Sequence, residues 1–251
     1  MKTMKIIKTY RIYILIALLL IFMSKGVEAF TEKDIPRLQA SVSHLKTGDR
    51  IVFWARQFLG TAYDPEPSGT YVKNKVIVFD QQVNSMYLVC RAVELALSST
   101  PHEAIDIALE KRFFILGVLK DNKVQNYNER YEYPMDMILS SKWGKDITEE
   151  LGSTVNVEAS RTWDTQKILP KKDIQKWMRN LQNGDLIFFV KDEKKRRSGE
   201  LIGNMGIIEK TKNGVYLIYA REGTNGSVVA DKLSSYLNSS GLIGVKVTRF
   251  R

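Results

Sequence analysis

Apolar residues in the first half of the chain recur with the spacing of amphipathic helices. The central stretch covers residues 84–97, and its apolar residues fall three and four positions apart, at Met86, Val89, Val93 and Leu97. Asn84 precedes the stretch and can accept a helical backbone N–H as an N-cap. We therefore expect a core helix whose first residue, Ser85, places a hydroxyl where the helix dipole favours negative charge. Many nucleophiles occupy such a position.

The same periodicity predicts three further helices, over 32–46, over 49–59 and from Thr100 onward. Thr47-Gly48-Asp49 is expected to break the chain between the first two. Thr100 and Glu103 fit a capping box at the start of the third helix. Residues 64–69 contain two prolines and a glycine, which predict an irregular loop.

Short β-branched and apolar runs predict strands, mostly in the last third of the chain, at 75–79, 186–190, 203–210, 215–221, 227–230 and 242–249. Lys212-Asn213-Gly214 is a hairpin turn signal, and Asp231 is expected to cap a small helix through Leu237. The charged run 191–197 favours a solvated hairpin tip over a polyanion site. Residues 120–160 show weak periodicity. Helices followed by antiparallel strands predict an α+β fold.

The N-terminus has the layout of a secretory signal peptide. A basic leader precedes the apolar run 12–23, and Val27-Glu28-Ala29 offers a cleavage site before Phe30. The alternative is an uncleaved anchor, but the run is shorter than the roughly 20 residues that span a bilayer. We expect residues 1–29 to be removed, residues 30–251 to form one domain without a stable membrane span, and the product to be periplasmic or secreted.

Charge and residue counts narrow the chemistry. The leader holds five basic residues and one acidic residue, so its removal lowers the net charge from +10 to +6. This moderate charge suits an envelope rich in anionic polymers and does not argue for nucleic acid. The single cysteine, Cys90, permits no internal disulfide, and no cluster has metal-ligand spacing, so we expect no metal or cofactor. His44 and His102 occupy helix-end positions that favour structural roles.

Five motifs in order resemble those of a known family, namely Phe58–Tyr63, the helix at Ser85, Gly184–Phe188, Gly203–Ile208 and Leu217–Ala220. The chain resembles the amidase-like branch of the NlpC/p60-type cell-wall hydrolases, that is, the N-acetylmuramoyl-L-alanine amidase-like domain of unknown function 1460. The resemblance covers nearly all of residues 30–251. It implies a papain-like fold, with the nucleophile-position helix packed on an antiparallel sheet or open barrel, and a peptidoglycan substrate.

The family's catalytic positions are replaced in this chain. The resemblance aligns the family's Asp-Cys pair with Asn84-Ser85, the strand histidine with Asn204, and the third polar residue with Tyr219. A serine hydroxyl needs a strong adjacent base, an amide offers none, and a tyrosine ionises only near pH 10. Loss of such a nucleophile or base typically costs on the order of a millionfold in turnover. These replacements predict a pseudoenzyme.

Three hypotheses follow. The first is a secreted protein that binds a peptidoglycan fragment or an envelope protein without cleaving it, in a groove lined by Tyr63, Asn84, Arg130, Trp143 and Met205. The aromatic residues of 120–160, namely Tyr131, Tyr133 and Trp143, are as well explained by covering the core under a long loop. The second is an active amidase or peptidase that uses Ser85 or Cys90 with Tyr219 or His102. The third is an inhibitor or chaperone of an active paralogue, whose groove is closed by Tyr219 or Met205.

The signal-peptide prediction is tested by the mass of the secreted chain. Expression with export should yield a chain that begins at Phe30, because the small residues at the end of the leader suit signal peptidase. Intact-mass spectrometry of the exported protein measures the cleavage site. Recovery of the full 251-residue chain from the membrane fraction would favour the anchor.

Overall fold

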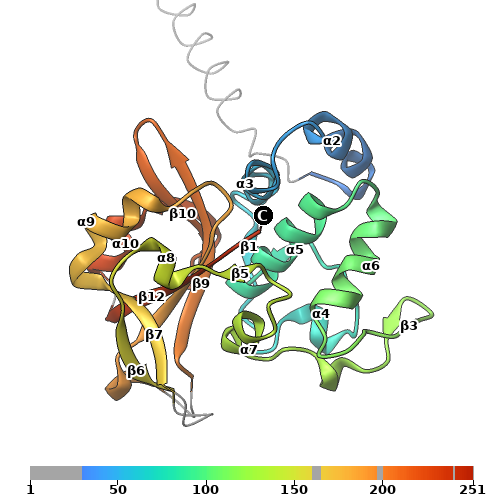
Figure 1. The fold of residues 1–251 in the computed structure, drawn as a ribbon. Coiled ribbons are helices and arrows are strands. Elements are labelled where there is room, and N and C mark those ends of the chain that lie inside the picture. Colours follow the sequence, from blue (N-terminus) through green and yellow to red (C-terminus); the bar gives the residue numbers. More distant parts are fainter. Residues whose placement is uncertain (1–29, 160–164, 197–199, 240, 251) are drawn as a thin grey trace, which may run out of the picture.

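The computed structural model describes residues 30–159, 165–196, 200–239 and 241–250. Helices from the first half of the chain stand beside a sheet built by the second half (Figure 1). The α+β class is thus confirmed. The predicted signal peptide and Arg197 of the charged run lie outside the described residues. Among the described residues, no helix combines the length and apolarity needed to cross a bilayer.

The helical half contains most of the helices, and short ones also flank the sheet. The α-helices are α2 (Ile35–Val42), α3 (Thr47–Gln57), α4 (Thr70–Lys73), α5 (Ser85–Leu97), α6 (Pro101–Lys111), α7 (Pro134–Leu139), α8 (Thr148–Leu151), α9 (Ile174–Trp177) and α10 (Leu233–Ser239). Short 3-10 turns are η1 (Glu32–Asp34), η2 (Tyr127–Glu129), η3 (Lys171–Asp173), η4 (Met178–Asn180) and η5 (Glu193–Lys195).

The main sheet has the strand order β11-β10-β9-β8-β12-β7-β6, with β5 beside β12, and its pairs are antiparallel. Its strands are β5 (Lys145–Asp146), β6 (Val155–Glu158), β7 (Thr165–Pro170), β8 (Leu186–Lys191), β9 (Ile202–Thr211), β10 (Gly214–Ala220), β11 (Val228–Lys232) and β12 (Leu242–Arg249). Two small pairs join β1 (Ala62–Tyr63) to β2 (Gln82–Val83), and β3 (Leu119–Lys120) to β4 (Lys123–Val124).

Several predicted elements differ from the structure. Thr47-Gly48-Asp49 does not break the chain but forms the first turn of α3. A glycine is required there because a Cβ on Gly48 would lie 2.1 Å from the Asn183 carbonyl oxygen. Residues 75–79 form no strand, since Lys75 has a φ of 55° and the segment runs as a turn and irregular loop between α4 and β2.

Other differences are local. The expected irregular loop is followed at once by α4, and Asp231 lies within β11 instead of capping α10. The first helix is shorter than expected, beginning with the 3-10 turn η1 and continuing as α2. Strands β6 and β7 were not expected, since β6 has only four residues and the residues of β7 (Thr-Gln-Lys-Ile-Leu-Pro) do not alternate between polar and apolar.

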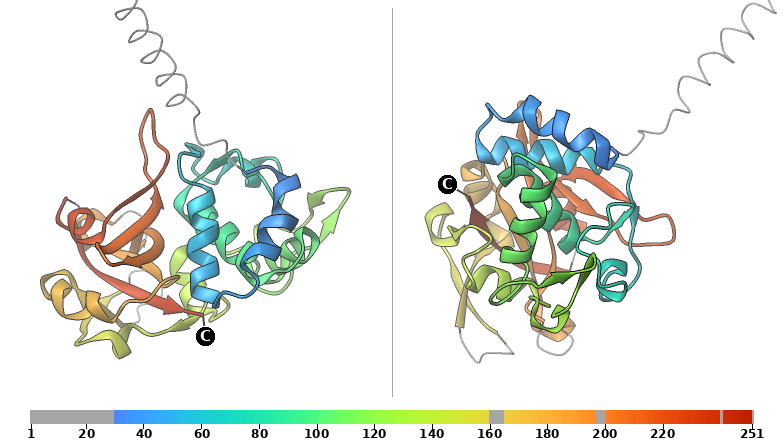
Figure 2. Two further views of the ribbon diagram at one scale, coloured as in Figure 1. Left: turned by 90° about the horizontal axis from the view of Figure 1, so that it is seen from above. Right: turned by 90° about the vertical axis from the view of Figure 1, so that its right-hand side faces the viewer.

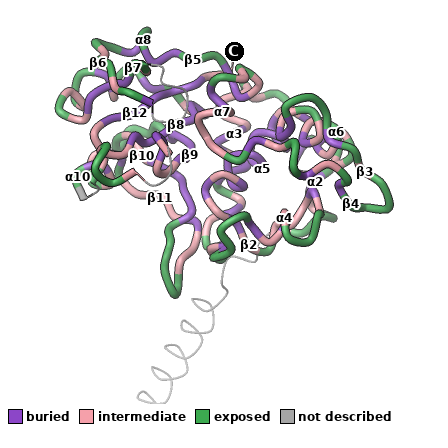
Figure 3. Tube along the Cα trace, turned by 90° about the horizontal axis from the view of Figure 1, so that it is seen from below, coloured by how far each residue is buried: buried purple, intermediate pink, exposed green. Residues whose placement is uncertain are grey.

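Helix α5 is the centre of the helical half and packs against α3, α6, β9 and β10. Eleven of its residues are buried, more than its apolar stripe alone would place inside. Figure 2 shows α3 and α6 flanking α5 in the helical half, and Figure 3 shows the burial concentrated along α5 and the central strands. The Asn84 side chain accepts the Tyr87 backbone N–H at 2.8 Å, so the predicted N-cap is confirmed.

The carboxylate of Glu94 lies at the centre of this packing. Its side chain is fully buried, and the Arg112 guanidinium contacts it through two nitrogens at 2.6 and 2.8 Å. Arg91 lies 3.4 Å from the same carboxylate and binds Asp80 at 2.8 and 2.9 Å. Burial by itself lowers the pKa of the Arg112 guanidinium, but Glu94 more than offsets that effect and holds it well above its ordinary value.

Arg112 also links α6 to the segment before α5. It donates to the Ile77 carbonyl at 3.0 Å and stacks over the Tyr87 ring at 4.8 Å. The Tyr87 hydroxyl in turn accepts the Phe79 backbone N–H. These contacts replace the hydrogen bonds that the expected strand at 75–79 would have made.

We expect Glu94→Gln to lower the free energy of unfolding by about 3–5 kcal/mol, because it leaves two buried guanidinium groups without their shared counter-charge. Urea denaturation followed by circular dichroism measures this change. The matched control is Glu149→Gln, which removes an exposed ion pair with Lys167 and should cost less than about 1 kcal/mol. Equal losses in the two variants would show that the buried network does not govern stability.

Candidate functional site

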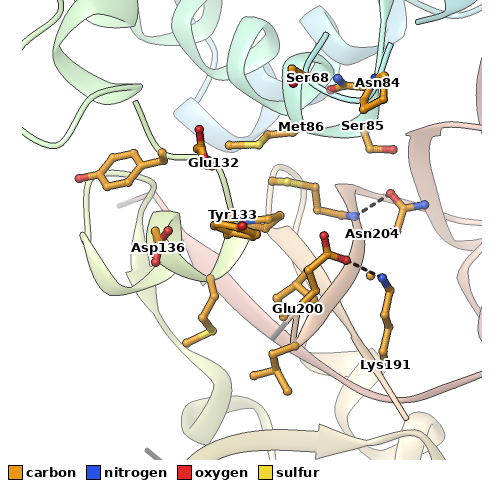
Figure 4. Close-up of a pocket in the computed structure, with 18 of the residues that line it drawn as sticks. Ser68, Asn84, Ser85, Met86, Glu132, Tyr133, Asp136, Lys191, Glu200 and Asn204 are labelled. Atoms are coloured by element: carbon orange, nitrogen blue, oxygen red, sulfur yellow. Dashed lines mark hydrogen bonds and ion pairs between the residues drawn. The ribbon is translucent and has the colours of Figure 1, made fainter. Parts of the chain in front are cut away.

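A cavity of about 500 Å³ lies between the two halves of the molecule at the start of α5. Most of its wall comes from four segments, namely the loop before α4, the first turn of α5, residues 130–136 around the start of α7, and the end of β8 with the start of β9. Ala159 and Glu222 also contribute to the lining. Figure 4 shows Ser68, Asn84, Ser85 and Met86 on one side, with Glu200 and Lys191 across from them. A space of this size suits a small ligand or a short peptide.

The Ser85 hydroxyl is bound to the backbone of β10. Its Oγ donates to the Ala220 carbonyl at 3.2 Å and accepts the Ala220 N–H at 3.3 Å. The side chain is buried, although it still borders the cavity. Of the described residues that line the cavity, none is a histidine. His44 and His102 are both exposed on other elements. The structure therefore brings no imidazole to Ser85.

The other two replaced positions converge on Tyr236 of α10. The Asn204 amide donates to the Tyr236 hydroxyl at 2.9 Å, and the rings of Tyr219 and Tyr236 lie 4.8 Å apart. The Tyr219 hydroxyl donates to Asp231 at 3.0 Å. Burial raises the pKa of Tyr219, so its phenol is protonated and cannot act as a base at neutral pH. Asn204 borders the cavity, whereas Tyr219 is not among the described lining residues.

Four of the five predicted groove residues line the cavity, and one does not. Tyr63, Asn84, Arg130 and Met205 all border it. Trp143 is not among the described residues that line the cavity, since its side chain is fully buried and its indole N–H donates to the Lys111 carbonyl at 3.0 Å. Trp143 covers the core beneath residues 120–160, the alternative left open for the aromatic residues of that region.

The loop that forms one wall is held by a buried carboxylate. Asp64 accepts the Thr70 N–H at 2.6 Å, the Thr70 hydroxyl at 2.9 Å and the Glu66 N–H at 3.1 Å. Gly69 has a φ of 81°, which favours glycine, and a Cβ there would meet the Tyr71 ring at 2.3 Å. The wall is therefore shaped before any ligand binds.

Acidic side chains dominate the charge of the cavity, although the whole chain is basic. The lining has five acidic residues and two basic ones, namely Glu66, Glu132, Asp136, Glu200, Glu222, Arg130 and Lys191. Lys191 pairs with Glu200 at 2.9 Å, and Arg130 pairs with Glu132 at 3.3 Å. The carboxylates come from segments far apart in the chain, so no spacing in the sequence signals that they meet. The lining favours a ligand that carries positive charge.

Cys90 lies about 1.4 turns after Ser85 on α5 and is part of the core. It is 4% exposed, and burial raises the pKa of its thiol well above the ordinary value. It is not among the described residues that line the cavity. A thiol in this environment behaves as a small apolar side chain.

Comparison with known proteins relates the chain to solved structures by fold. No family model and no curated protein matches it. An N-acetylmuramoyl-L-alanine amidase from Bacteroides uniformis has a TM-score of 0.65 at 18% identity, over 81% of this chain and 98% of that one. A Legionella pneumophila protein of the domain of unknown function 1460 gives 0.66 at 16% identity, over 86% and 93%. A proposed xylanase from Bacteroides fragilis gives 0.62 at 19% identity, over 78% and 98%.

At these identities the likeness shows an amidase-like fold and no more. One solved protein with this fold is described as an amidase and another as a proposed xylanase, so the fold does not determine the reaction. The function of this chain has to be argued from its own cavity.

The reactivity of Cys90 tests whether it serves as a nucleophile. We expect iodoacetamide to leave the folded chain unmodified near pH 8 and to alkylate it once in denaturant, because burial disfavours the thiolate. Mass spectrometry of both samples measures the label. Rapid modification of the folded chain would contradict a buried, protonated thiol.

Proposed function

We propose that this chain is a secreted protein of the bacterial cell envelope that binds a peptide-bearing fragment of peptidoglycan without cleaving it. One observation carries the proposal. The cavity is open, but the hydroxyl at the nucleophile position is bound to the Ala220 backbone, and no histidine is among the described lining residues. In this proposal, residues 30–251 form one NlpC-type, papain-like domain that retains the binding groove and has lost the catalytic residues.

The loss of catalysis follows from what each group can do with a proton. Attack by Ser85 requires a base that takes the hydroxyl proton as the new bond forms. Asn204 offers an amide, and its Nδ2 donates to Tyr236. The protonated Tyr219 hydroxyl donates a hydrogen bond to Asp231. Neither group can accept a proton near pH 7, so the attack lacks its first step.

The charge of the cavity indicates the kind of ligand. Carboxylates on several walls would attract an ammonium group, and peptide stems of the cell wall carry free amino groups. Tyr63 and Met205 add apolar surface beside them. The open volume of about 500 Å³ supports binding in the groove over the alternative of an inhibitor or chaperone, for which a groove filled by Tyr219 or Met205 was expected.

The proposal is tested by incubating the exported chain with purified peptidoglycan. Mass spectrometry of the soluble fraction should detect no released fragments, while the protein sediments with the insoluble polymer. A fragment that is released by the wild type and not by Ser85→Ala would overturn the pseudoenzyme and favour the alternative, an active amidase or peptidase with a nonstandard constellation. Failure of the protein to sediment with the polymer would overturn the proposed binding, even if no fragment is released.

The ligand class is tested by calorimetry with a soluble muropeptide and its N-acetylated form. We expect the free amine to bind roughly tenfold more tightly. Glu66→Gln with Glu222→Gln should remove most of that preference, because both carboxylates line the cavity. The control Glu193→Gln removes an exposed carboxylate outside it and should change nothing. Equal affinity for the two peptides would rule out recognition of the amine.

A further inference from the structure

A second surface, just after the end of α6, exposes several apolar side chains. Four apolar side chains stand in the solvent within five consecutive residues, which is unusual for an ordinary surface loop, with exposed fractions of 55% for Phe114, 81% for Ile115, 54% for Leu116 and 51% for Val118. We call residues 113–118 the apolar loop. The hairpin β3–β4 follows it at the outer edge of the helical half, away from the sheet (Figure 1).

One lysine binds the backbone of the apolar loop. The three N–H groups of the Lys142 ammonium are shared among four backbone carbonyls, those of Glu110, Phe113, Phe114 and Ile115, at 2.9, 2.8, 3.2 and 3.1 Å. The ammonium thereby satisfies one carbonyl of the last turn of α6, that of Glu110, and three carbonyls of the apolar loop itself. The Lys142 ammonium binds the backbone beneath the loop, and the apolar side chains face the solvent.

Asn126 completes the arrangement from the other side. Its Oδ1 accepts the Val118 N–H at 2.7 Å, and its Nδ2 donates to the Leu116 carbonyl at 2.9 Å. The Gly117 N–H donates to the Leu109 carbonyl at 2.7 Å. The Phe114 ring packs edge-on against Tyr131, which borders the cavity. Most backbone groups of the apolar loop therefore have a partner within the protein.

We infer that the apolar loop inserts into the interfacial region of an anionic phospholipid membrane. A segment that enters lipid must satisfy its backbone internally, because hydrocarbon offers neither donors nor acceptors. A protein partner would supply its own hydrogen-bonding groups and would not require this saturation. In the apolar loop, the carbonyls of residues 113–116 and 118 and the N–H groups of Phe114, Gly117 and Val118 are bonded within the protein, and the apolar side chains face outward. This arrangement suits shallow insertion into the interfacial region.

Charge around the loop fits the same surface. Lys120 and Lys123 are exposed on the hairpin that follows, with Asp121 between them, and residues 30–251 have a net charge of +6. Basic residues beside an apolar anchor strengthen binding to anionic headgroups. Because Tyr131 joins the loop to the cavity wall, insertion would hold the cavity close to the membrane surface. This inference uses a surface separate from the proposed groove and stands or falls independently of it.

Vesicle sedimentation tests the inference with the exported chain that begins at Phe30. Every described helix and strand follows that residue, so the exported chain keeps the described fold, and a thermal melt checks this. We expect it to sediment with vesicles of phosphatidylcholine and phosphatidylglycerol, more weakly with phosphatidylcholine alone, and less as salt rises. No sedimentation with either vesicle would overturn the inference.

Two variants separate the apolar and charged contributions. Ile115→Glu with Leu116→Glu should weaken sedimentation at least about tenfold, because it removes the most exposed anchor and adds negative charge. Lys120→Gln with Lys123→Gln should weaken binding to the anionic vesicles by roughly tenfold and leave the neutral vesicles unaffected. The matched control Val155→Glu alters an exposed apolar residue on β6 and should bind like the wild type. Unchanged binding in the loop variant, or equal loss in the control, would overturn the inference.

Discussion

The buried carboxylate of Glu94 is the constraint on which the helical half depends. A charge at that depth is tolerated only because Arg112 meets it with two hydrogen bonds and Arg91 adds a third contact. The two arginines then have to reach Asp80 and the Ile77 carbonyl, which fixes the segment that leads into α5. The position of the first turn of α5, and so of Ser85, follows from this network.

The network places Ser85 where a catalytic nucleophile could act, but the neighbouring groups do not activate its hydroxyl. Asn84 caps the helix and Ser85 stands at its start, yet the hydroxyl is bound to Ala220 of β10. On the sheet side, Asn204 and Tyr219 are engaged with Tyr236. The polar groups are satisfied locally, and the cavity between them has a lining in which carboxylates outnumber cations.

The sequence predicted best what local patterns control. The stripe of α5, the Asn84 cap and the hairpin of β9 and β10 are all set by residues near one another in the chain. It failed where distant contacts decide. Gly48 looks like a helix breaker until the Asn183 backbone passes beside it, and 75–79 looks like a strand until Arg112 and Tyr87 take its hydrogen-bonding groups. The acidic lining likewise exists only once the segments meet.

The cavity is formed by both halves of the molecule, with Ser85 and Asn84 from the helices and Asn204 and Glu200 from the sheet side. Any occupant would therefore touch both and act as a cross-brace between them. By mass action, its binding free energy would be added to the free energy that keeps the halves associated. Filling the cavity should make the two halves unfold as a single cooperative unit. Occupancy of the cavity would then be visible as a more cooperative unfolding transition.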